Sequence, residues 1–214
     1  MRTDDLIDRL SGALEPVPPA QVLRVLATGL GAGALLSALL MIATIGIRAD
    51  LMDAMAASAF WLKFVYTFAV AALGLAIVER LARPDAEIGR FFLLLAAPFL
   101  VMVALAAKEF LPADTATQQA LIMGHSARVC SVLIAALALP LFAGLFWALR
   151  QLAPTRLTEA GAAAGLLAGS AAATIYAFHC TESTPTFIAV WYSAGILLPV
   201  LLGAALGRSL LRWS

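Results

Sequence analysis

Charged residues are scarce in this 214-residue chain. Asp, Glu, Lys and Arg make up 13% of it, about half the share that a soluble domain carries, whereas 63% of the residues are hydrophobic. A water-exposed surface cannot be built from so few charges, so the composition excludes an ordinary soluble enzyme and a disordered chain. It indicates a membrane protein.

An excess of positive charge is also absent, since the formal net charge is +1. Binding to phosphate backbones depends on clustered Lys and Arg, so we expect no direct contact with nucleic acid. The two cysteines are too few for a disulfide scaffold or a four-thiolate zinc site, although they can form one bridge. The chain shows no Ser-His-Asp order, glycine-rich phosphate loop or paired intramembrane carboxylates, so we expect neither an enzyme nor a resident cofactor.

Long apolar stretches are abundant, and a membrane-crossing helix needs about 20 such residues. The sequence predicts an all-α integral membrane bundle of six transmembrane helices in residues 23–214, preceded by a cytoplasmic amphipathic segment in residues 1–22. Pro98, Pro140 and Pro199 are expected to kink the third, fourth and sixth helices. The predicted spans are residues 25–47, 59–78, 91–107, 127–149, 160–178 and 187–206.

The basic residues are unevenly divided between the two sides of this predicted bundle. Cytoplasmic loops retain Lys and Arg, so the richer side predicts the cytoplasm and places both termini there. The opposite side has only Arg48, Lys108 and Arg128 in its loops. The richer side carries Arg2, Arg9, Arg24, Arg80, Arg83, Arg90, Arg150, Arg156, Arg208 and Arg212.

Glycines recur at four-residue intervals in the fifth predicted span, at Gly161, Gly165 and Gly169. Small residues at this spacing let two helix backbones approach closely inside a membrane. We expect this stripe to pack against a neighbouring helix of the same chain. A homodimer through the same face is the alternative.

Both cysteines are predicted at the outer interface. Cys130 lies about 28 Å along its helix from the inner end, and Cys180 lies about 30 Å along the preceding stretch of chain, at about 1.5 Å of rise per residue. One interpretation is a redox-sensitive pair, or a soft-metal site that takes in His125, His179 and Glu182. The alternative is two unrelated small residues, because cysteine is commonly a buried hydrophobe.

Three further residues near the outer side have polar or aromatic side chains. Lys63 lies one turn inside the second span, where a lysine is expected to extend its ammonium to the interface, although it could instead belong to a transport or signalling site. Trp191 and Tyr192 are expected to be interfacial or packing aromatics.

The segment before the first span predicts a short amphipathic helix. Thr3 can cap it, and its side chains up to Glu15 sum to a net charge of −2. Anionic lipid would repel this segment, which favours a protein partner with a basic groove. The alternative is a solvated leader, because isolated helices of this length are marginal in water.

Five short motifs are spread over nearly the whole chain: residues 3–7 (TDDLI), 61–63 (WLK), 178–182 (FHCTE), 191–195 (WYSAG) and 207–213 (GRSLLRW). In these motifs the sequence resembles the NrsF family of bacterial membrane anti-sigma factors, the negative regulators of sigma F. The most specific part of the resemblance is the stretch around Cys180. The family often has proline where Thr181 stands, a departure that leaves the thiol chemistry unchanged.

This resemblance implies a protein that holds an extracytoplasmic-function sigma factor at the bacterial inner membrane. It implies release of that partner under external stress, such as oxidant or heavy metal. Cys130 and Cys180 would then be the periplasmic sensing thiols, and a heavy-metal ion could bind at the same two residues. The resemblance places the sigma contact in the first segment, at Asp4, Asp5, Leu6, Ile7, Asp8 and Leu10.

Two functions of other classes compete with this interpretation. A membrane thiol oxidoreductase working with a quinone would usually carry a close C-x-x-C pair, which is absent from the sequence. A small metal transporter would need carboxylates deep in its spans, and the six predicted spans have none there.

Overall fold

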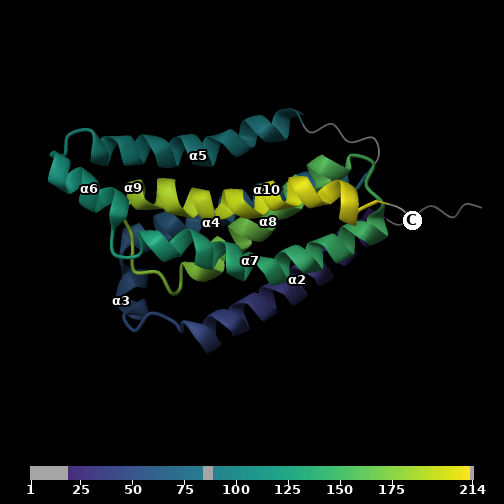
Figure 1. The fold of residues 1–214 in the computed structure, drawn as a ribbon, viewed down its shortest axis with the longest axis horizontal. Helices are drawn as coiled ribbons and strands as arrows, with labels where there is room; N and C mark the ends of the chain where they lie inside the picture. Colours follow the sequence, from purple (N-terminus) through teal and green to yellow (C-terminus); the bar gives the residue numbers. More distant parts are fainter. Residues whose placement is uncertain (1–18, 84–88, 213–214) are drawn as a thin grey trace, which may run out of the picture.

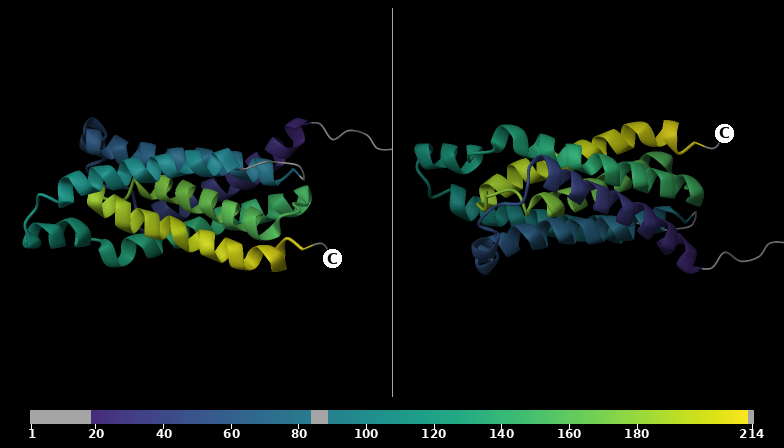
Figure 2. Two further views of the ribbon diagram at one scale, coloured as in Figure 1. Left: turned by 90° about the horizontal axis from the view of Figure 1, so that it is seen from above. Right: turned by 90° about the horizontal axis from the view of Figure 1, so that it is seen from below.

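The computed structural model describes residues 19–83 and 89–212, and within them all regular secondary structure is helical. Six long helices lie side by side along one axis (Figures 1 and 2). The all-α prediction is confirmed. The long helices are α2 (Pro19–Thr44), α4 (Ser58–Leu81), α5 (Gly89–Phe110), α7 (Ala127–Leu152), α8 (Leu157–Tyr176) and α10 (Ser193–Leu210).

Five stretches among the described residues are long and apolar enough to cross a membrane: helices α2, α4, α5 and α7, and the continuous run Pro185–Leu210 that ends with α10. Helix α8 matches the fifth predicted span but is rich in alanine and glycine, and it is largely buried by the other helices. A helix shielded in this way needs less apolar surface than one that faces lipid. The sixth span and the orientation of the termini stay predictions.

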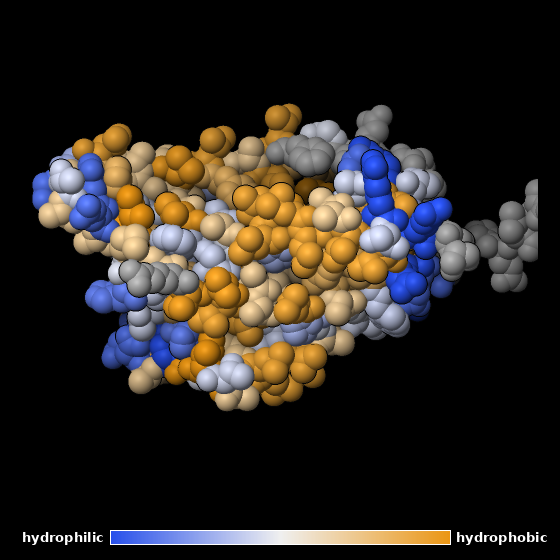
Figure 3. All heavy atoms as spheres, viewed as in Figure 1, coloured by the Kyte–Doolittle hydropathy of each residue, from blue (hydrophilic) through white to orange (hydrophobic). Residues whose placement is uncertain are grey.

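One end of the bundle contains short helices that the sequence did not predict. They are α3 (Leu51–Ala56), α6 (Thr115–Met123) and α9 (Pro185–Phe187), and α9 continues into α10 through a π-helical turn, η1 (Ile188–Tyr192). We call this the thiol end, because it contains Cys130 and Cys180. The opposite, basic end contains Arg80, Arg83, Arg90, Arg150, Arg156, Arg208 and Arg212. Figure 3 shows hydrophilic side chains at the two ends and a hydrophobic surface between them.

Helix α8 lies at the centre, in contact with α2, α4, α7 and α10. Its glycine stripe faces α10: Gly161 meets the backbone of Gly203, Gly165 meets Pro199, and Gly169 meets Ile196. A Cβ atom at any of these three glycines would collide with backbone atoms of α10. The prediction that the stripe packs within the chain is therefore confirmed.

Replacing Gly165 by valine should lower the stability of the bundle. The added side chain would force α8 and α10 apart, and overpacking of this kind costs roughly 1–3 kcal/mol. Gly31→Val in α2 is the matched control, because a Cβ at Gly31 meets nothing within 4 Å. The measurement is the thermal unfolding midpoint of the detergent-solubilised protein. Equal midpoints for the two variants would contradict this account of the α8–α10 contact.

Candidate functional site

Cys130 and Cys180 come together at the thiol end. Cys130 lies in the first turn of α7, and Cys180 lies in the loop 177–184 that follows α8. Both are free thiols, with relative exposures of 0% and 3%, and their side chains lie beside each other. The prediction that the two thiols reach the same level of the bundle is confirmed.

Two tyrosines flank the thiols. Tyr176 ends α8 and Tyr192 ends η1, and their ring centroids lie 6.0 Å apart. The Tyr176 hydroxyl is within hydrogen-bonding reach of both cysteines. The Tyr192 hydroxyl is buried, has no oxygen or nitrogen partner among the described residues, and faces Cys180. Of the two roles expected for Tyr192, interfacial or packing, its burial shows the packing one. No pattern in the sequence points to Tyr176.

Lys63 is fully buried beside this pair, with a relative exposure of 0%. Its Nζ atom donates hydrogen bonds of 2.8 Å to the carbonyl oxygens of Cys180 and Glu182, and it lies 5.7 Å from the centroid of the Tyr192 ring. The expectation that Lys63 extends to the interface is wrong. Two carbonyls and an aromatic face replace the water that its ammonium would otherwise seek.

Arg48 supports the same loop from the segment between α2 and α3. One guanidinium nitrogen donates to the Cys180 carbonyl at 3.2 Å, and the Arg48 backbone N–H donates to the carbonyl of Phe178 at 3.1 Å. Its remaining nitrogens bind Asp50 at 2.7 and 2.8 Å. The hydrogen bond from Arg48 lowers the pKa of Asp50 to about 2. The charge distribution of the sequence places Arg48 only as an external charge, and this structural role has no signal in the sequence.

The surroundings of Cys180 favour its thiolate. A hydrogen bond from Cys130 lowers the pKa of the Cys180 thiol, and the positive charge of Lys63 acts in the same direction, against the opposing effect of burial. A cavity of about 430 Å³ reaches Cys180 between Arg48, Tyr176 and His179. Cys130 does not line this cavity, so a reagent that enters it meets Cys180 first.

The proposed metal ligands do not converge. The His179 ring bonds the Gly46 carbonyl at 2.9 Å through Nδ1, and the His125 side chain is 98% exposed. The Glu182 carboxylate is engaged by His125, since its Oε1 accepts a 2.6 Å bond from the His125 backbone N–H. No group of three or more His, Cys, Asp or Glu side chains in the described parts of the chain is placed to hold a metal. The five-residue metal site predicted from the sequence is therefore wrong.

Trp191 joins three elements at the thiol end. Its indole N–H donates to the Ile122 carbonyl of α6 at 2.7 Å. Its own carbonyl accepts a 2.6 Å bond from the hydroxyl of Ser131, the residue after Cys130 in α7. The packing role expected for Trp191 is confirmed. The predicted sigma contact, residues 4–8 and Leu10, lies outside the described residues.

Lys63→Met should loosen the loop that carries Cys180. The substitution removes the Lys63 hydrogen bond to the Glu182 carbonyl and one of the two hydrogen bonds to the Cys180 carbonyl, and a buried group left unsatisfied costs about 1–3 kcal/mol. The matched control is Lys108→Met, which removes an exposed lysine near the same end of the bundle. Thermal unfolding in detergent should show a lower midpoint for Lys63→Met alone. A midpoint equal to that of Lys108→Met would contradict the structural role of Lys63.

A family model described as negative regulator of sigma F (NrsF) matches residues 10–213. A probable anti-sigma-F factor NrsF of Azospira oryzae is 39% identical over 213 residues, and an anti-sigma-F factor NrsF of Caulobacter vibrioides is 41% identical over 218 residues. Both alignments cover 100% of each chain. No solved structure matches. The chain belongs to the NrsF family of negative regulators of sigma F.

Proposed function

We propose that this protein is a membrane anti-sigma factor whose affinity for its partner depends on the chemical state of Cys130 and Cys180. The names of the two full-length relatives support the anti-sigma role. Anti-sigma factors are regulatory proteins and not enzymes, so membership of this family argues against both the thiol oxidoreductase and the metal transporter. The partner in this proposal is an extracytoplasmic-function sigma factor at the bacterial inner membrane.

The proposed orientation places the basic end in the cytoplasm and the thiol end in the periplasm. The support is the concentration of arginines at one end, because cytoplasmic loops retain basic residues. The sigma factor would then be held by the acidic, amphipathic residues 1–22, on the side of the membrane where transcription occurs. The stimulus would arrive at the opposite side.

The observation that carries the proposal is the contact between two buried thiols beneath a cavity that reaches one of them. A hydroperoxide entering this cavity supplies the oxidant. The Cys180 thiolate attacks the peroxide, takes up one oxygen as a sulfenic acid and releases hydroxide or alkoxide. The Cys130 thiol then displaces the sulfenic oxygen as water, and a disulfide forms. A soft metal ion is the alternative trigger, with these two thiolates as its ligands.

Direct contacts connect the thiols to helices α7 and α10. Ser131 follows Cys130 and bonds the Trp191 carbonyl, and Ile134 one turn later packs on Gly195 of α10. Bond formation between Cys130 and Cys180 would draw the start of α7 against the loop 177–184 and displace the η1–α10 junction. A coupling of about 1–3 kcal/mol between the two ends changes sigma affinity five- to 150-fold.

A Cys130→Ser, Cys180→Ser double variant should hold the sigma factor but no longer release it. In cells exposed to hydroperoxide, transcription from a sigma-dependent reporter should rise with the native protein and stay at its basal level with the double variant. His125→Ala is the control, because this exposed histidine does not reach the thiols, and it should respond as the native protein does. Full induction in the double variant would contradict the proposed trigger.

Removal of residues 1–15 should abolish capture of the sigma factor while leaving the helical bundle folded. The measurement is co-purification of the sigma factor from detergent extracts, with the elution volume of the truncated protein as a check on folding. Replacing Asp4, Asp5 and Asp8 by asparagine should weaken capture, whereas Glu15→Gln, outside the predicted contact, should not. Undiminished capture after truncation would move the contact to the loops of the basic end.

A further inference from the structure

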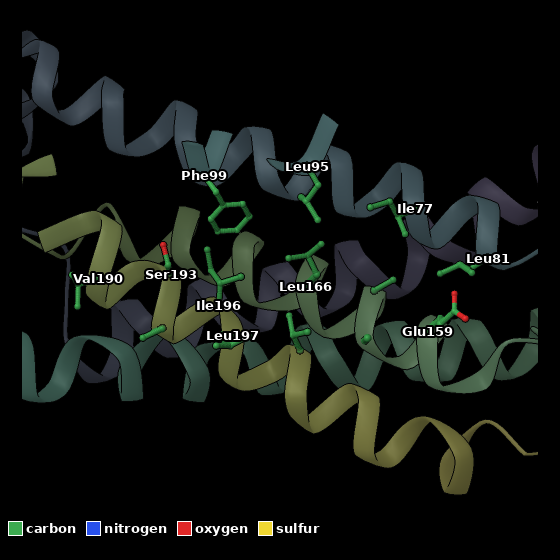
Figure 4. Close-up of a pocket in the computed structure, with 14 residues that line it drawn as sticks. Ile77, Leu81, Leu95, Phe99, Glu159, Leu166, Val190, Ser193, Ile196 and Leu197 are labelled. Carbon is green, nitrogen blue, oxygen red and sulfur yellow. The ribbon is translucent and has the colours of Figure 1, made fainter. Parts of the chain in front are cut away.

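An apolar cavity of about 580 Å³ separates α5 from the centre of the bundle. Helix α5 contacts α4, and it contacts α9 and η1 at the thiol end. Figure 4 shows Leu95 and Phe99 of α5 on one side of the cavity, facing Leu166 of α8 and Ile196 of α10 on the other. Twelve of its 14 lining residues are apolar, and the polar ones are Ser193 and Glu159.

The position of this cavity restricts what can fill it. Three of the elements around it, α4, α5 and the run that ends with α10, are long and apolar enough to cross a membrane. Apolar cavities exclude water, and an empty one forfeits dispersion contacts along its whole lining. In a bilayer the apolar chains at hand are the acyl tails of lipids. The surface between α5 and α10 is hydrophobic as well (Figure 3).

The basic end supplies a second, polar cleft of about 530 Å³ beside this cavity, and Glu159 lines both. The cleft is lined by Arg156, Arg208 and Arg212, against the single carboxylate of Glu159. Glu159 is itself paired with Arg156, and Arg208 is oriented by a 2.9 Å bond from its Nε to the hydroxyl of Thr158. Positive charge therefore remains for an anion, and guanidinium groups bind phosphates well.

We propose that the cavity and the cleft form one binding site for an anionic phospholipid. One acyl chain lies between α5 and the α8–α10 pair, and the phosphate headgroup lies among the arginines at the basic end. Basic pockets beside transmembrane helices bind anionic headgroups in this way. The bound lipid fills the gap between α5 and the core, so the position of α5 depends on the lipid.

The test measures lipid binding to the full-length protein in detergent micelles by native mass spectrometry. The probes are phosphatidylglycerol and phosphatidylcholine with identical acyl chains, and inorganic phosphate. We expect one phosphatidylglycerol molecule per protein, bound at least tenfold more tightly than phosphatidylcholine. Equal binding of the two lipids would overturn the proposal, and so would occupancy by inorganic phosphate that excludes the lipid, because the cleft would then be a site for the free anion.

Two sets of variants locate the site. Arg208→Gln with Arg212→Gln should weaken phosphatidylglycerol binding at least tenfold, whereas Arg24→Gln with Arg150→Gln, which removes the same charge from exposed positions, should not. Ala162→Leu should reduce binding by filling the apolar cavity. Unchanged phosphatidylglycerol binding in the Arg208→Gln, Arg212→Gln double variant or in Ala162→Leu would overturn the proposal. A dimer that Ala162→Leu dissociates would also overturn it, because a second copy would then cover the cavity.

Discussion

Helix α8 approaches α10 so closely that backbone touches backbone at Gly161, Gly165 and Gly169. Helices in a membrane gain little from hydrophobic exclusion, so direct contact of this kind is what holds a bundle together. The contact also fixes the rest of the molecule. With α10 held along one face, α8 carries α2, α4 and α7 on its other faces. Its last residue, Tyr176, and the loop that follows are thereby brought to Cys130 at the start of α7.

Two cationic side chains hold the loop that carries Cys180 at the thiol end. The Cys180 carbonyl accepts hydrogen bonds from both Lys63 of α4 and Arg48 of the α2–α3 segment. One backbone oxygen thus ties together three parts of the chain that are distant in sequence. Leaving the buried Lys63 ammonium without its carbonyl partners would bury an uncompensated charge, which is far more costly than the bond is favourable. The loop is therefore held in one arrangement, with Cys180 beside its partner thiol and beside positive charge.

Much of this architecture is predictable from the sequence, and the exceptions have a common cause. Apolar length locates the six long helices, glycine spacing predicts the α8–α10 contact, and helix rise places both thiols at one level. These are local or periodic properties. The partners of Lys63, Arg48 and Tyr176 depend on which loops meet at the thiol end, and a periodic pattern does not contain that information. For the same reason a set of His, Cys and Glu residues on one side of a membrane suggested a metal site, whereas the loops direct His125, His179 and Glu182 elsewhere.

The α9–η1 junction connects the thiol site to the surrounding helices. Thr186 of α9 donates two hydrogen bonds to Glu109 at the end of α5, of 3.0 and 3.2 Å. Trp191 of η1 contacts α6 and α7, and Tyr192 faces both Lys63 and Cys180. A π-helical turn has looser backbone bonding than an α-helix, and such turns are frequent at functional sites. The bundle therefore combines a close-packed α8–α10 core with an irregular turn in the α9–η1 segment, to which the thiols, α5 and α7 are all connected. That turn continues directly into α10, whose other end forms part of the basic end.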